Sequence, residues 1–384
     1  MAKRYHAAAA TTAIAVAILI LAVVLIGSIV GLLAQRHGMN HAQYLKTNTR
    51  VLQGWRAQTR RTRELARAAV AAAATNANVR AAPTLRADFP IDAVFTWVDA
   101  NDPAWRRARN AATPSLFHSQ QRDPVVVKPR DELFFSVRLA QHHMPWLRQI
   151  LIVTQRPQVP WWVESTSTST PTSTPRIVVV HHDEFFDPDV IQPTFNSNVI
   201  ESQFPRLSML AEHFVSFNDD TFVGQPMPRD AFFTPTGVPV VRHASRAHAR
   251  RLLIDFTNAV WTLQLTNASI VCDALNVPLR LPVHVALPQR KSVLERVTRV
   301  LKPLTRQWKP LRSSADFPIM YVASCATSPV ALPDVVKTGL YRNTRDFESA
   351  TARPGSPPHL FCINESFDAD LFARVLARYS AMHL

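Results

Sequence analysis

Residues 214–222 read FVSFNDDTF and carry the strongest structural signal in the chain. The apolar start of this stretch predicts a buried β-strand, which ends at Asn218 and the adjacent carboxylates Asp219 and Asp220. In open α/β sheets, ligands bind just beyond the carboxyl ends of the strands. Oxygen-bearing side chains at that position suit a hard divalent cation that is shared with substrate phosphates. Asn and Asp are also common at plain strand-to-turn junctions, so this stretch alone leaves both interpretations open.

The residues around this stretch predict alternating strands and helices. Four short runs rich in β-branched and aromatic residues are expected to be strands: 91–98, 150–153, 177–180 and 214–217. Between and after them, helical spacing or capping residues predict helices at 131–142, 198–212, 246–275, 292–304 and 368–379. The alternation predicts a layered α/β domain with a largely parallel sheet, followed by a mainly helical C-terminal part.

The basic charge of the chain is concentrated ahead of this α/β region. The 384 residues carry a formal net charge of +15, but residues 35–87 hold ten Arg or Lys and a single acid, Glu64. The body has neither zinc-finger spacing nor a basic stripe interleaved with aromatics, so we predict no nucleic-acid partner. The cysteines Cys272, Cys325 and Cys362 are too scattered for a zinc site. They allow either one disulfide with a free thiol or three buried thiols.

An uncharged apolar run, AIAVAILILAVVLIGSIVGLLA, occupies residues 13–34 after a short tail at residues 1–12. Its length matches the roughly 20 residues that span a bilayer as a helix and exceeds the apolar part of a cleaved signal peptide. We therefore predict a transmembrane anchor. The basic, Ala- and Arg-rich residues 35–87 are expected to form a largely helical stem. That stem either stays solvated or contacts anionic lipid headgroups.

Several segments of the body together resemble the Stealth family, which includes bacterial capsular-polysaccharide phosphotransferases and a eukaryotic N-acetylglucosamine-1-phosphotransferase. The first matching block is IDAVFTWVDANDPAW at residues 91–105. The second begins at residue 130 and resumes as PTFNSNVIESQFPRLSMLAEHFVSFNDDTFVG at residues 193–224, after a low-complexity insertion at residues 165–175. Fainter matches are HVALPQRKS from residue 284, LRSSAD at residues 311–316 and CINE at residues 362–365.

The resemblance implies that residues 88–384 form a Rossmann-like nucleotide-sugar transferase domain. Such an enzyme moves a hexose- or N-acetylhexosamine-1-phosphate from a UDP-linked nucleotide-sugar to a hydroxyl of a glycan or glycoprotein, and releases nucleoside monophosphate. A divalent metal, Mg²⁺ or Mn²⁺, would neutralise the diphosphate of the donor. In the family's pattern, Ala100 stands where a glycine is usual and Glu365 where an aspartate is usual.

The resemblance also assigns roles to individual residues. Asp219 and Asp220 are the expected metal ligands. The expected catalytic residues are His284 as a general base or nucleophile, Arg312 as a cation on the phosphoryl group, and Asp316 as an orienting group. Contacts to the donor are expected from Asp102, Asn196, Asn218 and Asn364. For Asp102 and Asn196, a turn and a helix cap are the competing explanations.

Two other functions stay open on the sequence: a metal-dependent glycosyltransferase that releases nucleoside diphosphate, and a non-catalytic relative that binds a nucleotide-sugar. The compartment is open as well. Glycosylation sequons occur at Asn267 and Asn364. The anchor and the Ser/Thr/Pro tract at residues 165–175 predict a single-pass membrane protein with its body in the Golgi lumen. A bacterial inner-membrane protein is the alternative.

Overall fold

The computed structural model describes residues 41–72, 88–112, 132–164, 175–243, 259–311, 316–326, 337–352 and 357–378. The chain divides into two compact units, residues 1–61 and 62–384, and the α/β body belongs to the second unit. The predicted anchor at residues 13–34 and nearly all of the low-complexity insertion lie outside the described residues. None of the described helices combines the length and the apolar character needed to cross a bilayer.

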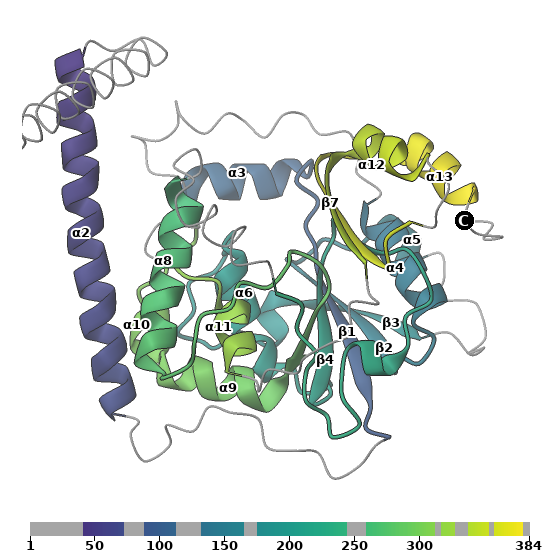
Figure 1. Cartoon of the computed structure of the whole chain (residues 1–384), viewed down its shortest axis with the longest axis horizontal. Helices are drawn as coiled ribbons and strands as arrows, with labels where there is room; N and C mark the ends of the chain where they lie inside the picture. Colours follow the sequence, from purple (N-terminus) through teal and green to yellow (C-terminus); the bar gives the residue numbers. More distant parts are fainter. Residues whose placement is uncertain are drawn as a thin grey trace, which may run out of the picture. The chain divides into compact units, whose positions relative to one another are not determined.

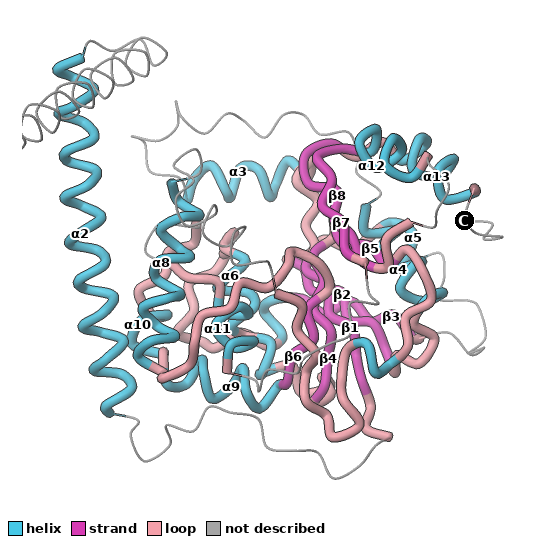
Figure 2. Tube along the Cα trace, in the orientation of Figure 1, coloured by secondary structure: helices cyan, strands magenta, loops and turns pink. Residues whose placement is uncertain are grey.

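A five-stranded sheet with the strand order β3-β2-β1-β4-β6 forms the centre of the body (Figure 2). Its strands are β1 (Ile91–Thr96), β2 (Gln149–Thr154), β3 (Arg176–His181), β4 (His213–Asn218) and β6 (Leu287–Arg290). The first four are parallel, and β6 runs antiparallel to β4. The four predicted strands are therefore confirmed. Strand β6 escaped prediction because it is short and contains Pro288, which is unfavourable inside a strand.

Helices cover both faces of this sheet (Figure 1). One face packs against α4 (Glu132–His143), and the other against α8 (Ala259–Ala274), α9 (Lys291–Val300) and α11 (Ile319–Cys325). Successive residues of a strand point to opposite faces. In β1, accordingly, Val94 lies in the core under α9 and α11, whereas Ala93 and Phe95 lie in the core under α4. This two-sided burial explains why the strands read as continuous apolar runs.

Several predicted helices are shorter than expected because prolines interrupt them. The helix predicted at 198–212 is wrong in length: α6 (Ser197–Ser202) gives way to the 3₁₀ turn η4 (Phe204–Arg206), which contains Pro205. Likewise, the helix predicted at 292–304 divides into α9 and α10 (Lys302–Thr305), with Pro303 in the first turn of α10. Proline is tolerated there because an N-terminal amide has no intrahelical partner.

The helix expected within residues 35–87 is present as α2 (His41–Ala72), and its role as a stem stays a prediction. Its residues 62–72 belong to the second unit, where Ala66 is fully buried and Leu65 and Val70 pack against the core that also contains α8 and α9. The end of the stem is therefore part of the folded body and not wholly solvated.

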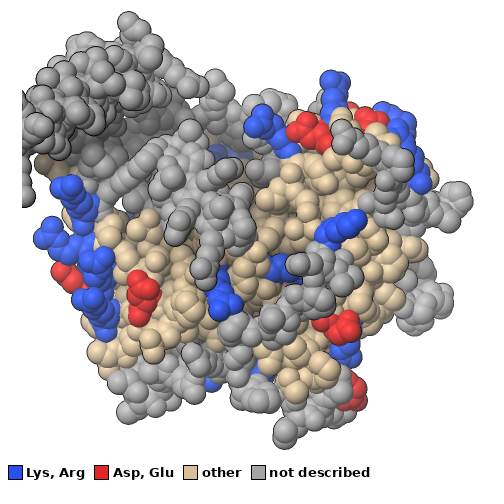
Figure 3. Space-filling model, in the orientation of Figure 1, with Lys and Arg blue, Asp and Glu red and all other residues tan. Residues whose placement is uncertain are grey.

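The described C-terminal part is mainly helical, as predicted, but it also contributes two strands to a second sheet that the sequence did not predict. This sheet has the order β5-β8-β7 and consists of β5 (Thr221–Val223), β7 (Thr338–Asn343) and β8 (Leu360–Ser366). It packs against α12 (Thr344–Thr351) and α13 (Ala369–Ala377), over which Figure 3 shows basic and acidic side chains intermixed. The predicted start of the last helix is confirmed, since the Asp368 side chain caps α13 by accepting from the amide of Leu371.

The three cysteines are free thiols, and all three are buried. Of the two possibilities left open by the sequence, the one with a disulfide is therefore wrong. Cys272 and Cys325 hydrogen-bond to each other in the core under α8 and α11, and this bond, together with burial, raises the pKa of Cys272. Cys362 lies on β8, next to the turn that follows β4.

Candidate functional site

The strand order places the ends of β1 and β4 at a topological switch point. The chain runs from β1 outward through β2 and β3, and then returns to add β4 on the other side of β1. Residues Thr96 and Asn218 are register partners at the carboxyl ends of these two strands. In open α/β sheets this crevice is where ligands bind. A pocket of about 440 Å³ opens here, and Asn218, Asp219, Asp220 and His284 are among its lining residues.

The turn that carries the two aspartates is held from three sides. The Thr221 hydroxyl donates to the carbonyl of Asn218 at 2.8 Å, and the Ser136 hydroxyl of α4 donates to the carbonyl of Thr221. From the second sheet, the amide of Ile363 donates to the carbonyl of Asp220 at 3.1 Å. The turn is therefore fixed before any ligand arrives, as a preorganised binding site requires.

His284 lies against the end of β4 although 66 residues separate it from Asn218. The Asn218 side-chain amide and the Nε2 atom of His284 are 2.8 Å apart. With the amide nitrogen as donor, Nε2 is the acceptor, and the neutral imidazole carries its proton on Nδ1. The structure thus brings together the second matching block and the HVALPQRKS segment, with an imidazole nitrogen at the pocket wall.

A possible metal-binding cluster is formed by Asp220, His284 and Cys362, whose ligand atoms all lie within 4.8 Å of one another. The thiol of Cys362 donates to Oδ2 of Asp220 at 3.3 Å. Burial, and then the negative charge of Asp220, raise the pKa of Cys362 well above its ordinary value. The Cys362 thiol thus orients the Asp220 carboxylate through this hydrogen bond.

Asp102 lies at the start of α3 (Pro103–Ala112) and does not line the switch-point pocket. Its Oδ1 atom accepts from the amide of Ala104 at 2.8 Å, and its Oδ2 atom accepts from the side chain of Gln158 at 3.0 Å. The bond from Gln158, followed by that from Ala104, lowers the pKa of Asp102. Both carboxylate oxygens are thus engaged within the protein, and the expected donor contact of Asp102 stays a prediction.

Asn196 and Asp316 meet each other in the interior, and both are fully buried. The Asn196 side chain caps α6 by accepting from the amide of Asn198 at 3.1 Å, and it donates to Oδ2 of Asp316 at 2.9 Å. The pair fixes α6, one wall of the pocket, to the segment that precedes α11. Neither residue is among those lining the pocket, so any contribution to function from this pair runs through the position of α6.

Two of the predicted site residues have side chains outside the described part of the structure. Arg312 lies outside the described residues, as does the side chain of Asn364, although its backbone belongs to β8. The neighbouring Ile363 bonds to Asp220, so the CINE segment runs directly beside the aspartate turn. Of the two glycosylation sequons, the one at Asn267 has a buried asparagine, whose side chain donates to the carbonyl of Asp316 at 3.1 Å. A glycan on Asn267 is incompatible with this fold.

Ala100 adopts no strained backbone where the family usually has glycine. Among the residues that the structure describes, Asn276 is the only non-glycine residue with a positive φ. The first turn therefore does not require the left-handed conformation that glycine favours.

The sequence did not single out the aromatic residues of the pocket. Its lining includes Trp97, Trp105, Phe195 and Tyr321, and the rings of Trp105 and Phe195 meet edge to face at 5.4 Å. Such surfaces suit the flat faces of a base or a sugar ring. Trp97 and Trp105 belong to the first family block, so the signal was present but resembled ordinary core aromatics.

The histidine-rich end of β3 does not form a metal cluster. Arg156 pairs with Asp183 and Glu184, in each case at 2.9 Å, and His182 turns inward to stack on Phe186 at 4.8 Å. Burial lowers the pKa of His182 to about 4, so this imidazole is neutral near pH 7.

A doubly wound sheet with carboxylates and a histidine at its switch point defines the class of α/β enzymes that bind their substrate at the carboxyl edge of the sheet. Comparison with known proteins is more specific. The family model for Stealth protein CR1, conserved region 1, matches residues 89–116, and that for CR2, conserved region 2, matches residues 127–241. The chain belongs to the Stealth family, and it is an enzyme that transfers phosphorus-containing groups.

Among the similar proteins is a capsular polysaccharide phosphotransferase of Haemophilus influenzae, 30% identical over 72% of this chain and 79% of that relative. A capsular polysaccharide phosphotransferase of Aeromonas hydrophila is 29% identical over 72% of this chain and 79% of that protein. An exopolysaccharide phosphotransferase of Streptomyces coelicolor is 35% identical over 63% of this chain, which spans only 38% of that longer relative.

Proposed function

We propose that this protein moves a hexose- or N-acetylhexosamine-1-phosphate from a UDP-linked nucleotide-sugar to a hydroxyl of a bacterial cell-surface polysaccharide. The observation that carries the proposal is the meeting of Asn218, Asp220 and His284 at the switch point, from blocks far apart in the sequence. The relatives named as capsular and exopolysaccharide phosphotransferases support the polysaccharide acceptor and a bacterial setting. A membrane anchor at residues 13–34 remains part of this proposal.

In the proposed reaction, the acceptor oxygen forms a new bond to the phosphorus that carries the sugar. The bond from that phosphorus to the bridging oxygen of the diphosphate breaks, and nucleoside monophosphate leaves with this oxygen. The hydroxyl proton goes to Nε2 of His284, which exchanges its bond with Asn218 for one to the acceptor. Asn218 is then free to bind the donor. Arg312 would stabilise the charge on the phosphoryl group, and Asp316 would hold α6 in place through Asn196.

The residues present fit a hard divalent cation such as Mg²⁺ or Mn²⁺. The carboxylates of Asp219 and Asp220 are the oxygen donors that such ions prefer. The hydrogen bond from the Cys362 thiol orients the Asp220 carboxylate. When bound, the ion would offset the negative charge of the donor's diphosphate.

The test is the identity of the nucleotide product. Full-length protein, incubated with Mn²⁺ or Mg²⁺, a panel of UDP-sugars and an oligosaccharide acceptor, is expected to release UMP, and Asp219→Asn or His284→Ala should lower the rate at least ~100-fold. Asp370→Asn, at an exposed position on α13, removes the same charge away from the site and should leave the rate unchanged. Release of UDP would instead identify a glycosyltransferase, and donor binding without any product would identify a non-catalytic relative.

A further inference from the structure

A second pocket lies on the other side of α6 from the switch-point pocket. Val199 and Ser202 of α6 line this second pocket, while Ser197, Asn198 and Glu201 of the same helix line the first. Thr194, just before α6, lines both. The volume of the second pocket is about 260 Å³, which suits a single sugar unit with a charged group better than a whole nucleotide-sugar. We call it the α6 pocket.

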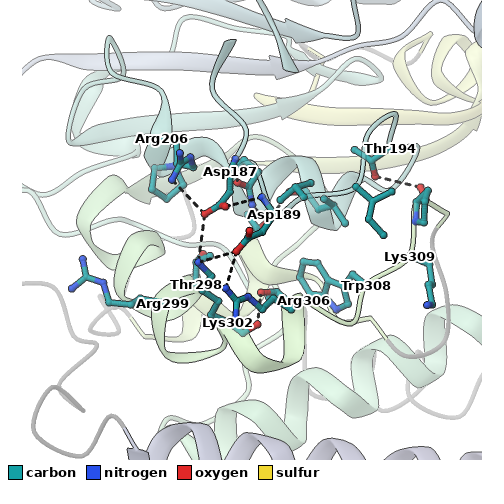
Figure 4. A pocket seen from close by; sticks show the side chains of 18 of the residues that line it. Asp187, Asp189, Thr194, Arg206, Thr298, Arg299, Lys302, Arg306, Trp308 and Lys309 are labelled. Atoms are coloured by element: carbon teal, nitrogen blue, oxygen red, sulfur yellow. Dashed lines mark hydrogen bonds and ion pairs between the residues drawn. The ribbon is translucent and has the colours of Figure 1, made fainter. Parts of the chain in front are cut away.

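The rim of the α6 pocket is rich in cations. Five basic residues line it against three acidic ones: Arg206, Arg299, Lys302, Arg306 and Lys309 against Asp187, Asp189 and Glu295. Figure 4 shows Lys302 held between Asp187 and Asp189, at 3.5 and 3.9 Å, and Arg306 paired with Asp189 at 2.7 Å. The aspartates hold these two cations in position, and the remaining excess of positive charge favours an anionic ligand.

Two residues that line the α6 pocket each carry a buried polar atom that bonds to nothing within the described parts of the chain. These atoms are Nε1 of Trp308 and Oγ1 of Thr298. Trp308 is only 5% exposed, and its ring packs edge to face on Phe317 at 5.1 Å. Leaving a buried donor without a partner is unfavourable, and such atoms commonly mark a missing ligand or water.

The α6 pocket is also tied to the segment that precedes Arg312. The carbonyl of Pro310 accepts from the amide of Phe195 at 2.7 Å and from the hydroxyl of Thr194 at 3.3 Å. The same short stretch before α6 therefore borders both pockets and bonds to Pro310, the residue just before the LRSSAD segment. A ligand in the α6 pocket lies next to the switch point without occupying the carboxylates there.

We propose that the α6 pocket binds a phosphodiester-linked sugar unit of the acceptor polysaccharide. This inference rests on the proposed function, because transfer of a sugar-1-phosphate to a hydroxyl creates a phosphodiester. An acceptor that has already been extended thus carries an anion close to its growing end. Lys302 and Arg306 bind the phosphate, the N–H of Trp308 donates to a phosphate or sugar oxygen, and the free end of the chain passes Thr194 toward His284.

Binding can be measured without turnover. By calorimetry on the full-length protein, a disaccharide of two glucose units joined by a phosphodiester should bind, and maltose, which is neutral, should not. Replacing both cations in the double variant Lys302→Gln, Arg306→Gln should weaken binding about tenfold or more. Arg345→Gln, an exposed change on α12, is the matched control and should have no effect. Equal binding of both probes, or full affinity in the double variant, would overturn the inference.

Trp308→Phe keeps the ring packing and removes the unpartnered N–H. We expect phosphodiester affinity to fall about three- to tenfold while the melting temperature stays constant or rises. Unchanged affinity would show that the indole N–H does not contact the ligand. UMP release from a UDP-sugar with a high concentration of a neutral oligosaccharide acceptor separates this inference from the proposed function. The double variant should retain that release, because a neutral acceptor needs no phosphate contact. Absence of UMP release in the unmodified protein, with every UDP-sugar and acceptor tried, would refute the proposed function and leave the binding result standing.

Discussion

The bond between Asn196 and Asp316 gives the most direct test of how α6 is held. Replacing Asn196 with alanine removes the cap of α6, which is worth about 1 kcal/mol. It also removes a hydrogen bond of 2.9 Å to a buried carboxyl group, and bonds to charged groups contribute about 1.5–3 kcal/mol. The expected loss is therefore roughly 3 kcal/mol, a large part of the ~5–15 kcal/mol typical of a folded domain.

Asn343 provides a matched comparison on the surface. Its side chain caps α12 by accepting from the amide of Asp346 at 2.9 Å, so Asn343→Ala removes the same kind of cap where no buried carboxyl is involved. Only the capping contribution of about 1 kcal/mol should be lost. Urea unfolding of the full-length protein, followed by tryptophan fluorescence, measures both variants. Equal losses in the two variants would refute the argument, because they would leave no contribution from the bond to Asp316.

Asn196→Asp adds a second readout. The new carboxylate can still cap α6, but it faces Asp316 in the interior, where two negative charges repel each other strongly. We expect this variant to be less stable than Asn196→Ala at pH 7. It should regain stability as the pH falls and one of the two carboxyls takes up a proton. A stability difference between the two variants that does not depend on pH would contradict the direct contact.

Two further predictions concern the body. Arg148→Met should lower the free energy of unfolding by about 2–4 kcal/mol, because Asp92 is fully buried and accepts from Arg148 at 2.8 and 2.7 Å. Arg156→Met removes an exposed ion pair and should leave the urea midpoint of the unmodified protein unchanged within error. Acid should destabilise the protein, since burial lowers the pKa of His182 from 6.5 to about 4. The unfolded chain therefore binds this proton more readily than the folded protein does. The stability that neutral His182 contributes is fully present above pH 6.5 and is lost as the pH falls toward 4. Between pH 7, 5.5 and 4.5, the free energy of unfolding should fall less for His182→Phe than for the unmodified protein. An equal fall in both would exclude His182 as a cause of the acid destabilisation.

Local sequence was sufficient for much of the fold. The strands of the parallel sheet are buried on both faces, so their apolar runs are visible without any tertiary information. The cap at Asp368 is equally local, since a capping side chain bonds to an amide only a few residues away. Pro205 and Pro303 are local signals as well, since each lies where a predicted helix ends or divides.

Non-local pairing decided the rest. Strand β5 is only three residues long, and it forms because Thr221 pairs with Cys362 of β8 across the chain; β7 in turn pairs with β8. No periodicity within a segment reveals such a partner.

The sequence by itself determined the aspartate turn after β4 and, through the order of its blocks, the Stealth family. Only the tertiary structure decided which neighbours that turn receives. It placed the amide of Asn218 on His284 and the thiol of Cys362 on Asp220, and it buried Asn196 against Asp316 instead of exposing it to the donor. The reason is physical: side-chain chemistry is encoded at each position, whereas the contacts that tune it depend on how distant segments pack.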